Sequence, residues 1–404
     1  AAMTLRAIRF MSKVRWRWLT LPSENRFPCG MAAWLHASLC LLGFGCLPVA
    51  IFTSQTQSRA ADRVETVAGT GRDSVNGTEG SAETVNIGEP FGVEVGPDGG
   101  LYITEVKNHR VWRMDLASKK LAVVAGNGSR GYSGDGGLAT DAQLNEPYEV
   151  RFDADGNMYF VEMMNHLIRR VDRKTQRIST VAGAPEPGFA GDGGPARLAR
   201  FRQPHSIALD GRDGLWIADI GNHRIRRIDL RSGMISTVIG NGEKVLPKSG
   251  MAAAGQPILG PRALFVDGAT LWIGLREGNS IWSMNLDSGI LRRECGTGQA
   301  GYAGDGQDPL EARFNGPKGI AVDRKGRVLI VDTENQVIRA FDPRSKTLST
   351  LAGSGKRGTG GTEVAGSDAR NAEFDRPHGI GVGPDGKIYV GDTLNHRVRT
   401  IVGE

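Results

Sequence analysis

Cysteine is scarce in this chain of 404 residues. Only four cysteines are present, and three of them, Cys29, Cys40 and Cys46, lie close to the N-terminus. Cys295 is the fourth, and the long remainder of the chain holds no second cysteine with which it could form an internal disulfide. The fold must therefore be stabilised by packing rather than by cross-links, and cysteine usage leaves the redox compartment open.

A surplus of charge of one sign is also missing outside the N-terminal segment. The formal net charge of +6 comes from 50 lysine and arginine residues against 44 aspartate and glutamate residues. Residues 1–60 contain seven of these bases and one of the acids, so the rest of the chain carries 43 of each. Because nucleic-acid-binding proteins typically present a basic surface, this balance gives no support to nucleic-acid binding.

Familiar catalytic motifs are absent as well. The sequence after residue 60 contains no Ser-His-Asp order, no cysteine–histidine pair and no glycine-rich phosphate-binding loop. It therefore gives no indication of a catalytic residue for nucleophilic chemistry, nor of a nucleotide site.

The N-terminal segment has the order of an export signal. A basic leader at residues 1–30 precedes an uncharged apolar run at residues 31–52, and a short polar linker follows at residues 53–62. The sequence Ser58-Arg59-Ala60 would serve as a cleavage site of the small-x-small kind. The apolar run is also long enough to cross a bilayer as an uncleaved anchor. We therefore expect an extracytoplasmic protein, either secreted or periplasmic, or anchored in a membrane through this segment alone.

An internal repeat dominates the rest of the chain. The steps between the prolines that open successive units are 57, 57, 57, 56 and 60 residues: Pro90, Pro147, Pro204, Pro261, Pro317 and Pro377. In the clearest unit, Pro204–Gly240, four runs of apolar and β-branched residues are separated by turns rich in aspartate, asparagine and glycine. Each unit is therefore predicted to be a meander of four short strands, within one array over residues 63–404.

The last unit lacks a fourth strand, and a matching strand stands at the start of the array. The sequence RVETVAG at Arg63–Gly69 is similar to ISTVAG at Ile178–Gly183, the fourth strand of the second unit. A ring that is closed by this strand leaves no free sheet edge at its ends. The predicted fold is all-β: a six-bladed β-propeller of four-stranded antiparallel blades, closed by an N-terminal strand that completes the last blade.

The repeated unit resembles a known family. The opening Pro-x-Gly-Val, the second strand Leu-Tyr-Ile-x-Asp and the motif Asn-His-Arg-Ile-Arg are similar to NHL repeats, which implies a six-bladed propeller with the first strands around a central channel. The fourth unit has Gly278-Asn279-Ser280 in place of the Asn-His pair, and we expect it to be locally distorted. We interpret the four Asn-His histidines as ties between neighbouring strands: His109, His166, His223 and His396.

The residue after each opening proline is expected at the mouth of this channel, as the resemblance implies. The six positions hold Phe91, Tyr148, His205, Arg262, Lys318 and His378. His205 and His378 break the repeat instead of keeping it. The cations Arg262 and Lys318 on adjacent units favour an anionic ligand, such as a carboxylate or a sugar acid, and Tyr148 would form an aromatic wall.

A second ring is expected on the same face, at the ends of the second strands. It comprises Glu105, Glu162, Asp219, Asp332 and Asp392, while the fourth unit has Leu275-Arg276 instead. Carboxylates beside imidazoles and cations in one opening could form a binding or acid–base site, for which Glu162 and Asp219 are the candidates. Repeated carboxylates at strand ends more often close hairpins by accepting backbone hydrogen bonds, and this structural interpretation stays open beside the functional one.

Three glycine-rich inserts contain an aspartate in the sequence Gly-Asp-Gly. These aspartates are Asp135, Asp192 and Asp305. We expect them to cap backbone N–H groups before a short helix such as the one predicted at residues 195–198. A calcium-binding loop is the alternative, although a single carboxylate in each loop is little for that ion.

Two classes of function follow. The first, which we favour, is a ligand- or protein-binding scaffold that uses the channel mouth and the insert-bearing face, without a cofactor or nucleic acid. The second is a metal-dependent enzyme of the lactonase or lyase kind, with Ca or Zn at His205 and His378 and with Glu162 or Asp219 as the base. It rests on a likeness of the Pro-His segments to peptidylglycine amidating lyase and of the carboxylates to gluconolactonase-like propellers. The histidines fall on opposite units, which does not match the lyase's alternate blades.

Overall fold

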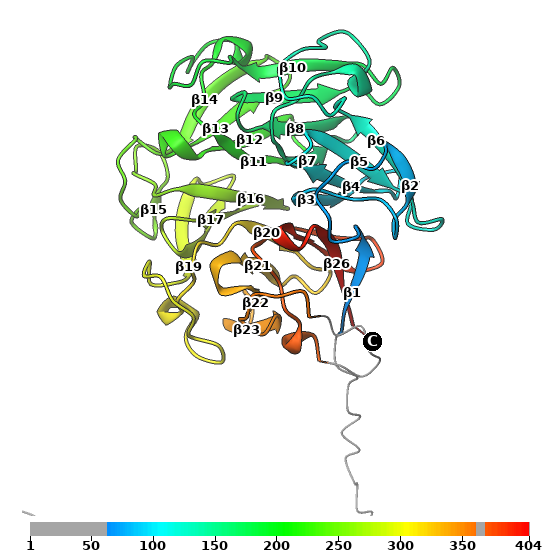
Figure 1. The fold of residues 1–404 in the computed structure, drawn as a ribbon. Helices are drawn as coiled ribbons and strands as arrows, with labels where there is room; N and C mark the ends of the chain where they lie inside the picture. Colours follow the sequence, from blue (N-terminus) through cyan, green and yellow to red (C-terminus); the bar gives the residue numbers. More distant parts are fainter. Residues whose placement is uncertain (1–62, 361–367, 404) are drawn as a thin grey trace, which may run out of the picture. The chain divides into compact units, whose positions relative to one another are not determined.

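Six antiparallel sheets follow one another along the chain (Figure 1). The computed structural model describes residues 63–360 and 368–403. The leader, apolar run and linker predicted for residues 1–62 lie outside this description. Within the described residues, no helix has the length and apolar character that crossing a membrane requires.

Each blade is a meander whose strands follow the chain, the first strand being innermost. Blade 1 comprises β3 (Pro90–Val95), β4 (Leu101–Glu105), β5 (Arg110–Met114) and β6 (Lys120–Ala125). Blade 2 comprises β7 (Pro147–Phe152), β8 (Met158–Glu162), β9 (Leu167–Val171) and β10 (Ile178–Gly183). Blade 3 comprises β11 (Pro204–Leu209), β12 (Gly214–Asp219), β13 (Arg224–Asp229) and β14 (Met234–Ile239).

The second half of the ring repeats this arrangement. Blade 4 comprises β16 (Pro261–Asp267), β17 (Thr270–Leu275), β18 (Ser280–Asn285) and β19 (Ile290–Cys295). Blade 5 comprises β20 (Gly319–Val322), β21 (Val328–Asp332), β22 (Val337–Asp342) and β23 (Thr347–Ala352). Blade 6 comprises β24 (Pro377–Val382), β25 (Ile388–Asp392), β26 (Arg397–Val402) and β1 (Arg63–Ala68).

The ring closes in the predicted way. Strand β1 pairs antiparallel with β26, with Val64 opposite Ile401, and Figure 1 shows the two strands side by side. Each inner strand contacts the next one around the ring, and β24 contacts β3. The prediction of an all-β, six-bladed propeller completed by an N-terminal strand is therefore confirmed.

The inserts between blades cover the outer strands. Short strands that the sequence did not predict, β2 (Glu79–Ser81) and β15 (Met251–Ala252), pair with β6 and β19. In blades 2 and 3 the inserts make single bridges instead, Leu138 with Arg177 and Pro195 with Met234. Covering an exposed edge in this way prevents it from pairing with another chain.

Short 3-10 helices accompany the inserts and the tight turns. Those in the inserts are η1 (Ala139–Asp141), η2 (Ala196–Leu198), η4 (Pro309–Glu311) and η6 (Ala369–Asn371). Those between the second and third strands are η3 (Ile220–Asn222), η5 (Thr333–Asn335) and η7 (Thr393–Asn395).

The core lies between adjacent blades, because strand side chains alternate and each sheet buries both faces. Between blades 2 and 3, for example, Val161 and Ile168 pack with Ile207 and Ile217, all fully buried. Each aliphatic side chain buried in this way contributes about 1.5–3 kcal/mol.

A ring of hydrogen bonds latches each blade to the next. The residue that ends the tight turn after the second strand accepts a bond from the backbone N–H of the residue before the next opening proline. In four blades this residue is a histidine, and its Nδ1 accepts at 3.1–3.2 Å: His109 from Glu146, His166 from Gln203, His223 from Gly260 and His396 from Glu89.

The other two blades form the same latch with amide side chains. In blade 4, Asn279 Oδ1 accepts from Gly316 at 2.9 Å, and in blade 5 Gln336 Oε1 accepts from Arg376 at 2.6 Å. Strands β17 and β18 keep an unbroken register. The expectation that blade 4 is distorted there is therefore wrong, because Asn279 takes over the role of the histidine.

Candidate functional site

All six predicted mouth residues line one cavity, Phe91 among them. Tyr148, His205, Arg262, Lys318 and His378 surround a space of about 220 Å³ at one end of the channel. The residue after the proline projects there because the register of the first strand shifts at this point, as between Pro204 and Ser206 and between Pro261 and Ala263. The skipped residue has no cross-strand partner, which frees its side chain for the mouth. The remaining lining residues are Glu89, Arg276, Arg376, Thr393 and Leu394.

This cavity, here called the bowl, narrows toward the channel and ends close to the mouth. The space beneath it amounts to about 10 Å³, no more than about one water occupies. The inner strands approach closely here: a Cβ atom on Gly379 would lie 2.0 Å from the carbonyl oxygen of Phe91, and one on Gly319 would lie 2.3 Å from that of His378. Only glycine allows this approach, and the space for a small molecule at this end of the channel is therefore confined to the mouth.

Aromatic rings form one wall of the bowl. Phe91 stacks on the imidazole of His378 with 4.0 Å between ring centroids, and its centroid lies 4.4 Å from that of Tyr148. Tyr148 in turn meets His205 edge to face at 4.9 Å. The wall spans blades 6, 1, 2 and 3 and offers ring faces to a planar or apolar group.

The two mouth histidines are neutral hydrogen-bond acceptors. His205 Nδ1 lies 2.7 Å from the carbonyl oxygen of Gln203, and His378 Nδ1 lies 2.8 Å from that of Arg376. A carbonyl oxygen only accepts, so Nδ1 carries the proton and Nε2 is left as an acceptor. Burial, reinforced by the nearby Arg262 and Lys318, holds the pKa of both histidines well below its usual value. The histidines therefore add no positive charge at neutral pH.

Arg262 is a buried cation without an acidic partner. Its side chain is 5% exposed, and within the described residues it makes no ion pair and no hydrogen bond. The centroid of the Tyr148 ring lies 5.4 Å from its guanidinium carbon, and the charges of Glu149 and Glu277 act on it without forming an ion pair. Burial lowers the pKa of Arg262 to about 10, so the group stays charged at neutral pH.

Lys318 differs from Arg262 because it has a carboxylate partner. Its Nζ donates to Glu334 Oε1 at 2.9 Å. Burial lowers the pKa of Lys318 to about 8, against the opposing effect of Glu334.

Glu162 and Asp219 do not line the bowl. Both are fully buried inside their own blades. Glu162 accepts from the backbone N–H of Asn145 at 3.1 Å and contacts Arg169, while Asp219 accepts from Asn222 at 2.8 Å. Burial raises the pKa of Glu162 to about 7 and that of Asp219 to about 6. Their lone pairs are occupied within the blade, so these carboxylates are not available to a ligand at the mouth.

The sequence analysis missed the partners of these carboxylates. The carboxylate, an asparagine three residues later and an arginine seven residues later form one buried group in blades 2, 3, 5 and 6: Arg169, Arg226, Arg339 and Arg399 are the arginines. In blades 1 and 4 the last position holds Trp112 and Trp282. The repeated spacing of acid, asparagine and arginine was the signal that could have revealed them.

The Gly-Asp-Gly inserts complete this group. Asp135 binds Arg169 at 2.9 Å, Asp192 binds Arg226 at 2.6 Å, and Asp305 binds Arg339. The expectation that these aspartates cap the insert helices is wrong, because each carboxylate turns to the buried guanidinium instead. In the part of the chain that the structure describes, no group of three histidine, cysteine or acidic side chains could hold a metal ion.

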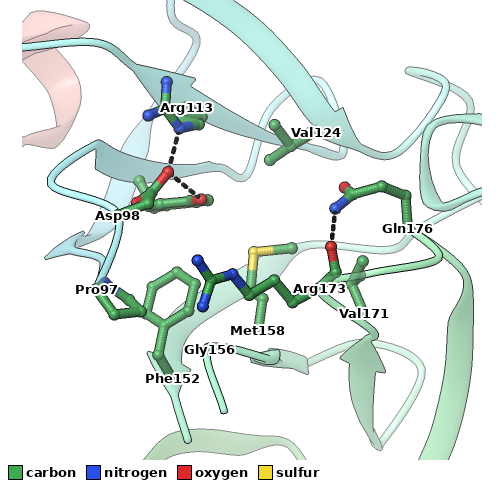
Figure 2. A pocket seen from close by; sticks show the side chains of 11 residues that line it. Pro97, Asp98, Arg113, Val124, Phe152, Gly156, Met158, Val171, Arg173 and Gln176 are labelled. Carbon is green, nitrogen blue, oxygen red and sulfur yellow. Dashed lines mark hydrogen bonds and ion pairs between the residues drawn. The ribbon is translucent and has the colours of Figure 1, made fainter. Parts of the chain in front are cut away.

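A second cavity lies at the other end of the strands, between blades 1 and 2. It measures about 270 Å³, and Figure 2 shows Phe152, Met158 and Arg173 around it. Asp98 is already paired with Arg113 at 2.6 Å. A related groove of about 450 Å³ lies between blades 5 and 6, so such grooves recur where turns of adjacent blades meet. The sequence predicted no site here.

Three comparisons place the chain among known proteins. The family model described as NHL repeat matches residues 201–228, 314–341 and 374–401. NHL repeat-containing protein 2 of Bos taurus is 26% identical over 353 residues, which cover 75% of this chain and 46% of that protein. The chain thus spans less than half the length of this relative.

Two solved structures share the fold. An auxiliary nutrient binding protein from Bacteroides thetaiotaomicron has a TM-score of 0.62 at 16% identity, covering 85% of this chain and 76% of that one. A gluconolactonase from Xanthomonas campestris has a TM-score of 0.54 at 12% identity, covering 86% of this chain and 91% of that one. At these identities the likeness concerns the fold alone.

Proposed function

Because this chain contains NHL repeats and has the fold of a six-bladed β-propeller, we propose that it is a binding scaffold whose channel mouth takes a small molecule bearing a carboxylate. The observation that carries this proposal is Arg262, a guanidinium that is 5% exposed and has no acidic partner in the described part of the chain. A buried charge is costly unless it is paired. An anionic ligand supplies that pair, and the planar fork of arginine suits a carboxylate.

The rest of the bowl supports the same ligand class. Arg276, Lys318 and Arg376 also lie in its lining, against the single lining acid Glu89. Glu334 pairs with Lys318 and Arg376, which leaves Arg262 as the buried cation without an acidic partner in the described residues. The rings of Tyr148 and of the other residues in the aromatic wall would cover a planar or apolar part of the ligand. The free Nε2 atoms of the histidines would accept hydrogen bonds from its hydroxyl groups. A nutrient-binding protein with the same fold is consistent with a binding role, although only by fold.

Calorimetric titration with small monocarboxylates, benzoate and gluconate among them, tests this proposal. We expect Arg262→Gln to weaken binding about 10- to 150-fold, because a charge-assisted pair at a buried site contributes about 1.5–3 kcal/mol. The matched control is Arg173→Gln, which removes an exposed arginine from the opposite cavity and should leave affinity unchanged. Equal affinity in wild type and Arg262→Gln would refute the mouth as the binding site.

The alternative, a metal-dependent lactonase or lyase, has less support from the geometry. It would need a base and ligands at the mouth, but Glu162 and Asp219 are bound inside their blades. His205 and His378 come without a third donor among the described residues. Elemental analysis of the purified protein separates the two proposals: one equivalent of Ca or Zn that is lost in His205→Ala would favour the enzyme.

We also infer that the protein is exported or tethered to a membrane, from the basic and apolar order of residues 1–62. A protein partner on the insert-bearing face is compatible with this location. Cell fractionation of the full chain and of a variant lacking residues 31–52 tests it, since only the full chain should leave the cytoplasm.

A further inference from the structure

Glu334 is an acid placed among the cations of the mouth. Its Oε1 accepts from Lys318 Nζ at 2.9 Å and from Arg376 at 2.8 Å, and its Oε2 lies 3.5 Å from Arg357. The half-buried carboxylate thus already occupies the position between two of the cations that line the bowl. Arg262, on the neighbouring blade, has no such partner in the described residues.

This acid breaks the repeat. The equivalent position, two residues before the end of the tight turn, holds Lys107, Met164, Gly221 and Leu394 in four other blades. In blade 4 it holds Glu277, which is exposed and lies 3.6 Å from the exposed Arg276. Glu277 is therefore a natural control: it is an acid at the same turn position, and it makes no ion pair with the buried Arg262 or Lys318. Its one ion pair among the described residues, with Arg276 in the lining of the bowl, is exposed and therefore weak.

We propose that Glu334 determines the specificity of the mouth for planar monocarboxylates over dicarboxylates. Glu334 neutralises Lys318 and Arg376, so that Arg262 is the cation that remains to bind a single carboxylate. This inference rests on the proposed function and adds the substrate class. The aromatic wall selects the planar part of such a ligand. A second carboxylate would have to displace Glu334 or lie beside it, and like charges in a partly buried site repel strongly. Specificity then comes from an unfavourable contact with the wrong ligand as well as from a favourable one with the right ligand.

Glu334 acts through the cations rather than by touching the ligand. Its test therefore measures the ratio of the affinities for a monocarboxylate and a dicarboxylate. We would titrate the full chain with benzoate and with phthalate, isophthalate and terephthalate, which cover three spacings of two carboxylates. For the wild type, benzoate should bind at least about tenfold more tightly than each of the three diacids, the size expected for one partly buried charge–charge contact.

Three variants sharpen the test. In Glu334→Gln, which frees Lys318 and Arg376, at least one diacid should gain about tenfold relative to benzoate. Glu277→Gln should leave the ratio within about twofold, and Glu334→Asp, which keeps the charge, should stay closer to the wild type than Glu334→Gln does. Thermal melts of each variant show whether it is folded at the titration temperature.

The outcomes are distinguishable. If benzoate binds the wild type but the ratio in Glu334→Gln stays within about twofold for all three diacids, the role of Glu334 is refuted and the binding function stands. If Glu277→Gln shifts the ratio as much as Glu334→Gln, a general surface charge explains selectivity and the proposal again fails. If neither benzoate nor any diacid binds the wild type, the proposed function and this inference fall together.

Discussion

In every blade the latch side chain follows the mouth residue by 17 or 18 residues, yet the two positions treat the repeat in opposite ways. At the latch, histidine, asparagine or glutamine performs one task six times, accepting a backbone N–H from the next blade. At the mouth, the residue after the proline differs in most blades, and the cations gather on blades 4, 5 and 6. Positions that repeat close the ring, and the positions that vary are those that we propose bind the ligand.

Substitutions in the buried acid–arginine groups should have the largest effect on the free energy of unfolding and no effect on ligand specificity. Arg226→Leu leaves the fully buried Asp219 without its cation. Because removing one partner of a buried pair strands the other, we expect a loss of about 3–5 kcal/mol in the free energy of unfolding. Urea titration measures it, with the exposed Arg231→Leu as the control at under about 1 kcal/mol. Similar losses in both variants would contradict the central role of the buried group.

Substitution of Arg262 should have the opposite effects, on ligand binding rather than on stability. Its guanidinium is buried without an acid in the described residues, so it costs desolvation that no ion pair offsets. We expect Arg262→Met to keep or raise stability, by up to about 1–2 kcal/mol, while carboxylate binding is lost. A melting temperature that falls by as much as in Arg226→Leu would make Arg262 a structural residue.

The latch predicts a dependence of stability on pH. Burial lowers the pKa of His109, His166 and His223 below the usual value of 6.5. Because the unfolded chain then binds protons at these histidines more readily than the folded one, the latch's contribution to stability is full above about pH 6.5 and falls as the pH drops toward the lowered values. Glu162 and Asp219, whose pKa is raised, act in the opposite direction, so the latch's contribution is measured as a difference between variants. The slope is at most about 1.4 kcal/mol per pH unit for each histidine.

Blade 5 offers a variant that separates hydrogen bonding from titration. Gln336 forms the latch without a titrating group. His166→Gln with His223→Gln should therefore keep the stability at pH 7.5 and flatten the loss toward pH 5, as measured by urea titration at both pH values. His223→Ala, which leaves the N–H of Gly260 unpaired, should lose about 1–3 kcal/mol at either pH. An unchanged slope in the double glutamine variant would contradict this origin of the pH dependence.

The period of the sequence was enough to predict the fold, because each unit specifies the same four strands and the surplus strand at residue 63 can pair only with the incomplete last blade. The mouth residues were predicted from their position after the proline together with the resemblance to NHL repeats, which implies that the first strands surround the channel. The direction of the carboxylates could not be predicted, since the ends of the second strands reach the mouth face while the Glu162 and Asp219 side chains turn into the blade toward Arg169 and Arg226. Glu334 was missed because only its contacts distinguish it from Glu277.

The smallest effect is expected at the Gly-Asp-Gly inserts. Asp135 is partly exposed and binds Arg169, so we expect Asp135→Asn to cost about 1 kcal/mol. Because a guanidinium already occupies this carboxylate, a calcium chelator should shift the melting temperature by less than about 1 °C. A larger shift on chelation would restore the calcium-loop interpretation.

The measurement that tests the account most directly is a crystal structure of the protein grown with benzoate. The account predicts a carboxylate bound by the guanidinium of Arg262, with its ring against Tyr148 and with Glu334 still on Lys318. Benzoate in the cavity between blades 1 and 2, or an empty mouth at a concentration that saturates binding in solution, would contradict it.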